Sequence, residues 1–306
     1  MIERRARTDE HARFPHPLHR AGFPATQRGT LADPAGDQWL LLERLHVLEM
    51  YTAPQKKFRA RDEAEVLEEI RRCGEQLIVQ RVFLADGDAL VLPTRRLLTI
   101  LEQIRQCLPE VQRVSSYCLP RNLRKKSVEE LRELADAGLG MAYVGAESGD
   151  DEVLARVNKG ETYDSTLSAL DKLGQAGIAR SVMILNGLGG RALSRQHARN
   201  SARLMNAAQP EFLSTLVVSF PHGDARFREG YENFEPLTLT DLLVELDWLL
   251  GDLELRDTVF RSDHASNYLV LKGALGADKR RLMSQLREAI DDPRNAPLRQ
   301  EWQRGL

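Results

Sequence analysis

Cysteine is scarce in this sequence of 306 residues, which contains three of them: Cys73, Cys107 and Cys118. They are too few and too scattered for the disulfide framework of a small secreted domain. Long apolar runs are also missing, because no stretch approaches the roughly 20 residues of a membrane-spanning helix. The charged N-terminus has no apolar segment behind it, unlike a secretory signal. We therefore expect reduced thiols in a cytoplasmic protein without a membrane partner.

An excess of one charge sign is absent as well. The sequence has 43 basic and 45 acidic residues, a formal net charge of −2. Nucleic-acid-binding domains usually carry a clear basic excess, so the composition gives no signal for a nucleic-acid partner. Hydrophobic residues at 42% and charged residues at 29% are typical of a globular domain.

Helical and strand patterns alternate between residues 39 and 221. Apolar residues at helical spacing predict helices, and short apolar runs ending in glycine or polar residues predict strands. The strands are expected at 39–42, 81–85, 113–118, 141–145, 179–185 and 212–220, with helices at 62–74, 95–108, 127–138, 150–157, 164–175 and 194–207. This alternation predicts an α/β fold, a partial (β/α)6 TIM-like barrel with its site at the carboxyl ends of parallel strands.

Three regions are expected along the chain. Residues 1–38 are rich in Arg, His, Pro and Gly without periodicity, which predicts a poorly ordered N-terminal lead-in. Residues 39–221 form the predicted barrel. Residues 222–306 form a predicted C-terminal α+β extension over the barrel mouth, with helices at 238–250 and 278–290 around a strand at 268–271.

Several predicted strand ends carry recognisable motifs. Tyr143–Leu154 reads Y-V-G-A-E-S-G-D-D-E-V-L and is followed by N-K-G from Asn158, while Phe83–Leu90 reads F-L-A-D-G-D-A-L and Ile184–Gly190 reads I-L-N-G-L-G-G. These motifs resemble those of the radical S-adenosylmethionine (radical SAM) superfamily. Two further segments, Met50–Arg59 and Ser262–Tyr268, are similar to segments of an uncharacterised bacterial branch of it.

The resemblance implies a specific chemistry. In this superfamily, three cysteines from a loop after the first strand hold a 4Fe–4S cluster, and S-adenosylmethionine binds its open iron. An electron from the cluster cleaves the sulfonium, and the resulting 5′-deoxyadenosyl radical abstracts hydrogen from a substrate. Flavodoxin or ferredoxin would be the electron donor. The substrate, a small molecule or another kind of compound, is unknown.

The resemblance also implies which residues bind S-adenosylmethionine. Glu147 would accept hydrogen bonds from the ribose hydroxyls. The backbone of Asp86, Gly87 and Asp88 would meet the methionine amino group, since glycine permits close approach. The remaining predicted cofactor-binding residues are Tyr51, Ser148, Asn186 and Gly187.

The cluster-binding loop departs from the family pattern. It should lie just before Met50, but no cysteine occurs between Trp39 and Met50. Leu and Val cannot ligate iron, so the metal ligands of the family are missing. Of the remaining thiols, Cys118 lies at a strand end and could face the barrel mouth, whereas Cys73 and Cys107 belong to outer helices. Helix packing is the simpler role for all three.

A shift of reading frame could explain this departure. If related proteins carry the loop C-S-W-N-A-C-T-F-C, it can be encoded TGC TCC TGG AAC GCC TGC ACG TTC TGC. Reading from the last base of the first codon gives Leu-Leu-Glu-Arg-Leu-His-Val-Leu, which is the sequence at 41–48. The codons are one choice among synonyms, so the frame shift is a hypothesis. Resequencing the DNA that encodes residues 39–50 tests it, because a clean reading on other codons would refute it.

Each candidate residue also has a purely structural interpretation. Glu147 can be a helix-start carboxylate stabilised by the helix dipole, and the Asp86–Asp88 and Asn186–Gly190 segments can be tight turns. Asp263, His264 and Ser266 suggest a hydrolase, but no G-x-S-x-G motif is present; with Tyr268, they could instead contact a substrate. The basic residues Lys56, Lys57, Arg59 and Arg61 suit a solvated face or an anion contact.

Three functions follow as expectations. The first is a radical SAM superfamily protein that is inactive as written because it cannot hold its cluster. The second is a cluster-free barrel that binds a nucleotide-like ligand. The third is a hydrolase or lyase that uses Asp86, Asp88 and Glu147 around a divalent metal.

Overall fold

The computed structural model describes residues 31–32, 38–42, 60–85, 88–219, 225–231 and 233–304. Of the predicted lead-in, the structure describes only residues 31, 32 and 38. Six residues singled out in the sequence also lie outside the described ranges: Tyr51, Lys56, Lys57, Arg59, Asp86 and Gly87. The end of the strand expected at 212–220 lies outside them too.

One sheet organises the described part of the chain, with its strands in sequence order. Neighbouring strands from β2 to β8 are parallel, and β1 and β9 are antiparallel at the two edges. The strands are β1 (Leu31–Ala32), β2 (Gln38–Leu42), β3 (Arg81–Leu84), β4 (Arg113–Cys118), β5 (Leu139–Glu147), β6 (Ala179–Asn186), β7 (Phe212–Val217), β8 (Val259–Ser262) and β9 (Leu271–Ala274). The predicted α/β fold of partial TIM-barrel type is confirmed.

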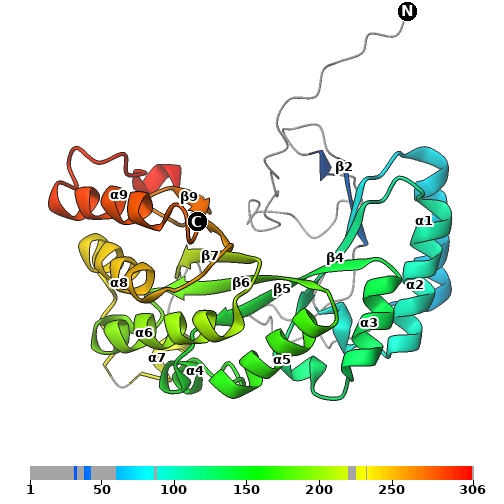
Figure 1. Ribbon diagram of the computed structural model, residues 1–306, viewed down its shortest axis with the longest axis horizontal. Coiled ribbons are helices and arrows are strands. Elements are labelled where there is room, and N and C mark those ends of the chain that lie inside the picture. Colours follow the sequence, from blue (N-terminus) through cyan, green and yellow to red (C-terminus); the bar gives the residue numbers. More distant parts are fainter. Residues whose placement is uncertain are drawn as a thin grey trace, which may run out of the picture.

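Helices cover one face of this curved sheet, which we call the outer face (Figure 1). They are α1 (Glu63–Gln76), α2 (Thr94–Cys107), α3 (Val128–Asp136), α4 (Asp151–Arg156), α5 (Tyr163–Gln175), α6 (Gly190–Ala208), α7 (Ala225–Arg228), α8 (Leu239–Asp252) and α9 (Lys279–Asp291). Short 3-10 turns follow β3 and β4, at Ala89–Val91 (η2) and Pro120–Leu123 (η3). The capping box predicted before α3 is present, because Ser127 and Glu130 exchange side-chain and backbone hydrogen bonds.

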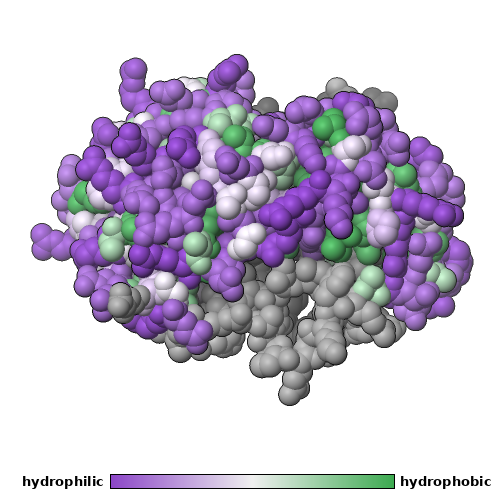
Figure 2. Space-filling model, turned by 90° about the horizontal axis from the view of Figure 1, so that it is seen from below, coloured by the Kyte–Doolittle hydropathy of each residue, from purple (hydrophilic) through white to green (hydrophobic). Residues whose placement is uncertain are grey.

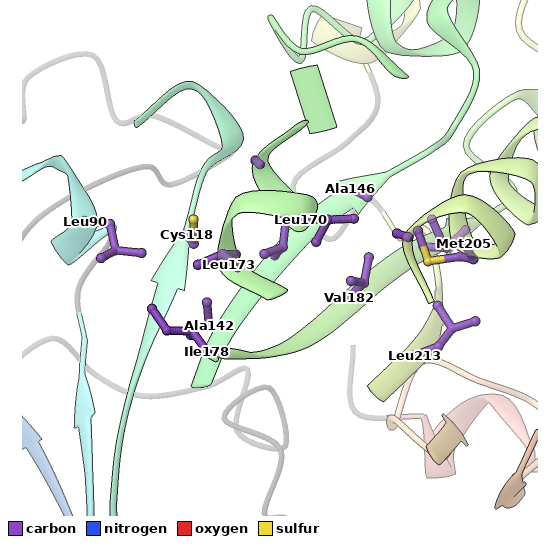
Figure 3. Close-up of a cluster of buried hydrophobic side chains, with 14 of the residues drawn as sticks. Leu90, Cys118, Ala142, Ala146, Leu170, Leu173, Ile178, Val182, Met205 and Leu213 are labelled. Atoms are coloured by element: carbon purple, nitrogen blue, oxygen red, sulfur yellow. The ribbon is translucent and has the colours of Figure 1, made fainter. Parts of the chain in front are cut away.

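The main core lies between the sheet and the helices (Figure 3). On β5, Ala142, Val144 and Ala146 point into this core, while Met141 and Tyr143 point to the opposite, inner face. This alternation is the normal consequence of strand pleating. On the inner face, Phe83 packs edge-on against the ring of Tyr117, with 4.8 Å between centroids.

The C-terminal region differs from the sequence prediction. The strand expected at 268–271 lies three residues further on, as β9, and the parallel strand β8 was missed. The apolar residues Tyr268 and Leu269 are not in a strand, because Arg299 and Arg304 hydrogen-bond the backbone of this segment instead. Because β8 pairs with β7, the seventh parallel strand comes from the region after residue 221.

The surface over the lower helices is mainly hydrophilic, with hydrophobic side chains scattered among polar ones (Figure 2). Within the described ranges, no helix has the length and apolar character needed to cross a bilayer.

Candidate functional site

The carboxyl end of β5 contains an unusual turn. Glu147 has a φ of 63°, in the left-handed region, and the Ser148 N–H donates to the Ala146 carbonyl at 2.7 Å. A hydrogen bond that spans one such residue closes a γ-turn of the strained kind. A non-glycine residue in this conformation costs on the order of 1–3 kcal/mol, and such strain is concentrated at functional sites. The motif that suggested Glu147 therefore coincides with a backbone outlier.

The turn directs the Glu147 carboxylate over the inner face of the sheet. Its Oε1 accepts a hydrogen bond from Lys159 Nζ at 2.9 Å, and both side chains are largely buried. A Cβ at Gly145 would overlap Glu147 Oε1. Gly145 follows Met141 and Tyr143 in the alternation on β5, so this carboxylate occupies the space of an inner-face side chain.

The paired charges can bind two kinds of group. A carboxylate accepts hydrogen bonds from neighbouring hydroxyls such as those of a ribose, and an ammonium group binds a carboxylate or phosphate. Both side chains end where the strands end, which is where α/β folds bind their ligands. This position suits a small ligand that carries hydroxyls and an acidic group.

Two other predicted cofactor residues point into the helical layer. Ser148 is fully buried, and its Oγ lies 2.8 Å from His197 Nδ1 on α6. Asn186 is also buried, and its Nδ2 faces the Leu242 carbonyl of α8 at 3.5 Å. Their role as cofactor ligands stays a prediction.

Gly187 adopts a φ of 87°, and its N–H donates to Glu245 Oε1 at 2.6 Å. In this arrangement the backbone N–H of Gly187 is satisfied by α8. Its predicted contact with the adenine or ribose also stays a prediction.

Asp88 caps the turn η2. Its carboxylate accepts hydrogen bonds from the Leu90 and Leu119 N–H groups and from Asn122 Nδ2. Burial raises the pKa of Asp88 to about 6, and these hydrogen bonds oppose part of that rise. Asp88 thus joins the ends of β3 and β4, in agreement with the structural interpretation of this segment.

The three thiols do not form a cluster site. Cys118 is buried in the core that faces the helices (Figure 3), and burial raises its pKa well above the usual value. Cys73 and Cys107 belong to α1 and α2. Across the described ranges, no three His, Cys, Asp or Glu side chains are grouped to hold a metal ion. The three cysteines therefore do not fit the ligand set of a 4Fe–4S cluster.

The S-D-H-A-S-N-Y segment, Ser262–Tyr268, begins in β8 and continues as a loop at its carboxyl end. His264 Nδ1 lies 2.8 Å from Ser266 Oγ, which accepts the Val217 N–H at 3.1 Å, and Asn267 Nδ2 donates to the Thr215 carbonyl at 2.7 Å. Ser266 is buried, and its hydrogen bond with the Val217 N–H joins this loop to β7. These contacts show that the segment joins the end of β8 to β7, and its predicted contact with a substrate stays a prediction.

The residues that sequence reasoning missed are Lys159, Gly145, His197 and Glu245. Lys159 lay inside the N-K-G motif, so a signal was present, although no role had been assigned to it. Gly145 preceded the glutamate by two residues. For His197 and Glu245 the sequence offers no signal, because neither belongs to a motif.

Comparison with known proteins identifies the family of this chain. The family model described as "Radical SAM superfamily" matches residues 46–205, just over half of the chain. The chain belongs to the radical SAM superfamily. This confirms the resemblance drawn from the strand-end motifs, and the matched range contains no cysteine before Cys73.

Individual relatives of this radical SAM protein are distant. The heme chaperone HemW of Bacillus subtilis (strain 168) is 22% identical over 157 residues, which span 51% of this chain and 41% of HemW. Coproporphyrinogen III oxidase (HemN) from Escherichia coli, described as a radical SAM enzyme, superposes with a TM-score of 0.49 at 15% identity, over 60% of this chain and 44% of HemN. Methylornithine synthase (PylB) gives a TM-score of 0.46 at 15% identity, over 76% of this chain and 63% of PylB. The chain thus spans less than half the length of HemW and HemN.

Proposed function

We propose that this radical SAM protein binds S-adenosylmethionine at the carboxyl end of β5 but, as written, does not cleave it, because no three thiolates are available for the cluster. The observation that carries the binding proposal is the Glu147 carboxylate, held over the inner face by a strained turn and paired with Lys159. Strain of this kind persists only where the surrounding structure imposes it. S-Adenosylmethionine, when bound in this superfamily, supplies the adenosyl group for radical chemistry.

Each residue of the pair has a separate task in this proposal. Glu147 accepts hydrogen bonds from the two ribose hydroxyls, and its low exposure strengthens them by excluding competing water. Lys159 neutralises the glutamate in the free protein, and its ammonium group can bind the ligand's carboxylate. The flat apolar rings of Phe83, Tyr117 and Tyr143 line the inner face below them.

Calorimetry with S-adenosylmethionine in iron-free buffer tests the binding proposal. We expect micromolar affinity for the wild-type chain and about a tenfold weaker affinity for Glu147→Gln, which is close to 1.4 kcal/mol. Glu133→Gln is the matched control, because Glu133 is an exposed glutamate of the outer helix α3. Absence of binding to the wild-type chain, or equal affinities for the two variants, would contradict the proposal.

Anaerobic reconstitution with iron and sulfide tests the cluster proposal independently. We expect no stoichiometric iron and no absorbance near 400 nm, roughly where thiolate-bound iron–sulfur clusters absorb, because the ligands of such clusters are missing. A chain in which a three-cysteine loop replaces residues 41–48 is the positive control. A reconstituted cluster in the unaltered chain would overturn this part of the proposal.

A cluster-free protein that binds a nucleotide-like ligand is the second candidate, and the same pair of charges favours it. Titration with adenosine separates the two: adenosine binding as tight as that of S-adenosylmethionine would indicate a nucleoside site without a role for the methionine group. The metal-dependent hydrolase has less support, since the Asp88 carboxylate already accepts hydrogen bonds from Leu90 of η2 and from Leu119, which follows β4. Asp86 lies outside the described residues.

The physiological partners remain proposals. If the cluster loop is restored, the chain requires a one-electron donor, for which flavodoxin or ferredoxin is our proposal from the family's chemistry. The substrate is unassigned.

A further inference from the structure

The strained turn at Glu147 is held by one face of α6. Gln196, His197, Asn200 and Ser201 occupy positions i, i+1, i+4 and i+5 of this helix, so they share a face. We call these four residues the α6 clamp. All four contact the three residues that follow Glu147.

The clamp contacts are short and specific. Ser201 Oγ accepts the Gly149 N–H at 2.9 Å, and Ser148 Oγ lies 2.8 Å from His197 Nδ1. Gln196 and Asn200 each donate a side-chain N–H to the carboxylate of Asp150. The helix approaches so closely that a Cβ at Gly149 would overlap the Asn200 carbonyl.

His197 and Ser148 are hydrogen-bonded to each other through Nδ1 and Oγ, and the tautomer of the ring sets which of the two donates. Ser148 Oγ also accepts the Asp150 N–H at 3.0 Å. On the other side of the ring, His197 Nε2 lies 3.9 Å from Glu245 Oε1 of α8, beyond hydrogen-bond distance, and has no hydrogen-bond partner among the described residues. His197 is almost completely buried, so its hydrogen bond to Ser148 is shielded from water.

Glu245 lies beside this ring and holds the end of the next strand. Its Oε1 accepts the Gly187 N–H at 2.6 Å, and its Oε2 accepts the Ser194 hydroxyl. Glu245 therefore ties the end of β6 to α6, whereas His197 ties the end of β5 to the same helix.

We propose that His197 is a positioning residue: through Ser148 it holds Glu147 in its left-handed turn, and so sets the affinity for the ligand that Glu147 binds. Its side chain is buried in the helical layer, away from the inner face, so it does not contact the ligand. The effect on affinity rests on the proposed function, whereas the effect on the turn does not.

Ligand affinity is the first test, with S-adenosylmethionine as the probe. His197→Leu removes the hydrogen-bond partner of Ser148, and His197→Asn retains one, because the asparagine amide can occupy the place of Nδ1. We expect the Kd to rise about tenfold for His197→Leu and to stay within about threefold for His197→Asn. Ser148→Ala deletes the same hydrogen bond from the other side, together with the one that Ser148 Oγ accepts from the Asp150 N–H, so its Kd should rise at least about tenfold. It replaces His197→Leu in this test if that variant does not fold.

Met205→Ala is the control for general destabilisation, because Met205 is buried on α6 outside the clamp. It should lower the melting temperature while the Kd of the folded protein stays unchanged. Loss of folded protein lowers the binding stoichiometry, whereas a misplaced Glu147 raises the Kd. Equal Kd values for His197→Leu and wild type, or a Kd for Met205→Ala raised as much as for His197→Leu, would overturn the proposal.

A second test needs no ligand. Glu147→Gly and Glu147→Ala both lose the carboxylate, but glycine alone tolerates a positive φ without strain. We expect the glycine variant to melt at a higher temperature than the alanine variant in the wild-type background. In the His197→Leu background this difference should disappear, because the released turn relaxes to a negative φ.

The two tests separate the two proposals. If the melting difference is present in the wild-type background and lost in His197→Leu, the clamp is supported even when no S-adenosylmethionine binds, and the binding proposal alone fails. If the difference is the same in both backgrounds, the clamp proposal is overturned whatever the affinities show.

Discussion

At position 145, the absence of a side chain makes room for the carboxylate of a residue two positions later. Glu147 Oε1 occupies the space that a Cβ at Gly145 would need, and Lys159 Nζ lies near the same point. The choice of one small residue therefore decides where a charged group is placed on the inner face. This relation depends on the left-handed φ of Glu147, since in regular strand geometry Glu147 would lie further along the strand.

Replacing Gly145 with Ala tests this relation. We expect the carboxylate to be displaced and S-adenosylmethionine to bind about tenfold more weakly, as measured by calorimetry. Gly251→Ala is the matched control, because a Cβ there makes an ordinary contact with the Met283 methyl group. That variant should keep its affinity, and a wild-type affinity for Gly145→Ala would contradict the prediction.

Asp88 gives a prediction for the pH dependence of stability. Burial raises the pKa of Asp88 in the folded state to about 6 from its ordinary value of 3.8, so the folded state binds more protons than the unfolded state between these pH values. The free energy of unfolding therefore falls as pH rises through this window, by about 3 kcal/mol for a shift of this size. Urea unfolding of wild type and Asp88→Asn at pH 4 and pH 7 measures it. The difference in the free energy of unfolding between wild type and Asp88→Asn should be about 2–3 kcal/mol smaller at pH 7 than at pH 4. An equal difference at the two pH values would refute the raised pKa of Asp88.

At the scale of elements, the sequence predicted the bounds of a helix or strand well where the hydrogen bonds that fix them join residues close in sequence. Ser127 and Glu130 predicted the start of α3, and both bonds of the capping box are present. The alternating patterns likewise predicted β4 at 113–118 without error. By contrast, α6 begins at Gly190, four residues before its predicted start, because the glycines that suggested a turn lie partly within the helix.

The capping box of α3 carries its own prediction. Ser127→Ala should lower the free energy of unfolding by about 1 kcal/mol, because the Glu130 N–H loses its acceptor at the helix start. Thermal unfolding with Ser168→Ala as the control, an exposed serine within α5, measures the effect. Equal losses for the two variants would show that the cap contributes nothing specific.

At the scale of the whole molecule, the sheet has an edge next to the segment that lacks the family's cysteines. β2 pairs with β3, while on its other side it pairs with the two-residue strand β1. A short edge strand leaves part of the adjoining core less well covered. The cysteine-free segment 41–48 therefore includes the end of β2, the first strand of the parallel series.

A chain with a restored three-cysteine loop should be more stable than the chain as written. We expect a higher melting temperature for the restored chain, measured with and without reconstituted iron, because a complete first unit covers the sheet edge. A restored loop with three serines in place of the cysteines is the control, and separates the effect of the missing chain from that of the metal. Equal melting temperatures for all three proteins would refute this prediction.

The sequence by itself determined the order of the strands from β2 to β7 and of the helices between them, the parallel α/β architecture, the superfamily and the absence of cluster thiolates. These properties depend on periodicity, on caps and on residue chemistry, all of which act over a few residues. Only the tertiary structure decided that Ser148 and Asn186 point into the helical layer, that β8 joins the sheet, and that Glu147 faces inward. These outcomes depend on contacts between residues about 50 positions apart, such as Ser148 with His197, and no local pattern encodes such a contact.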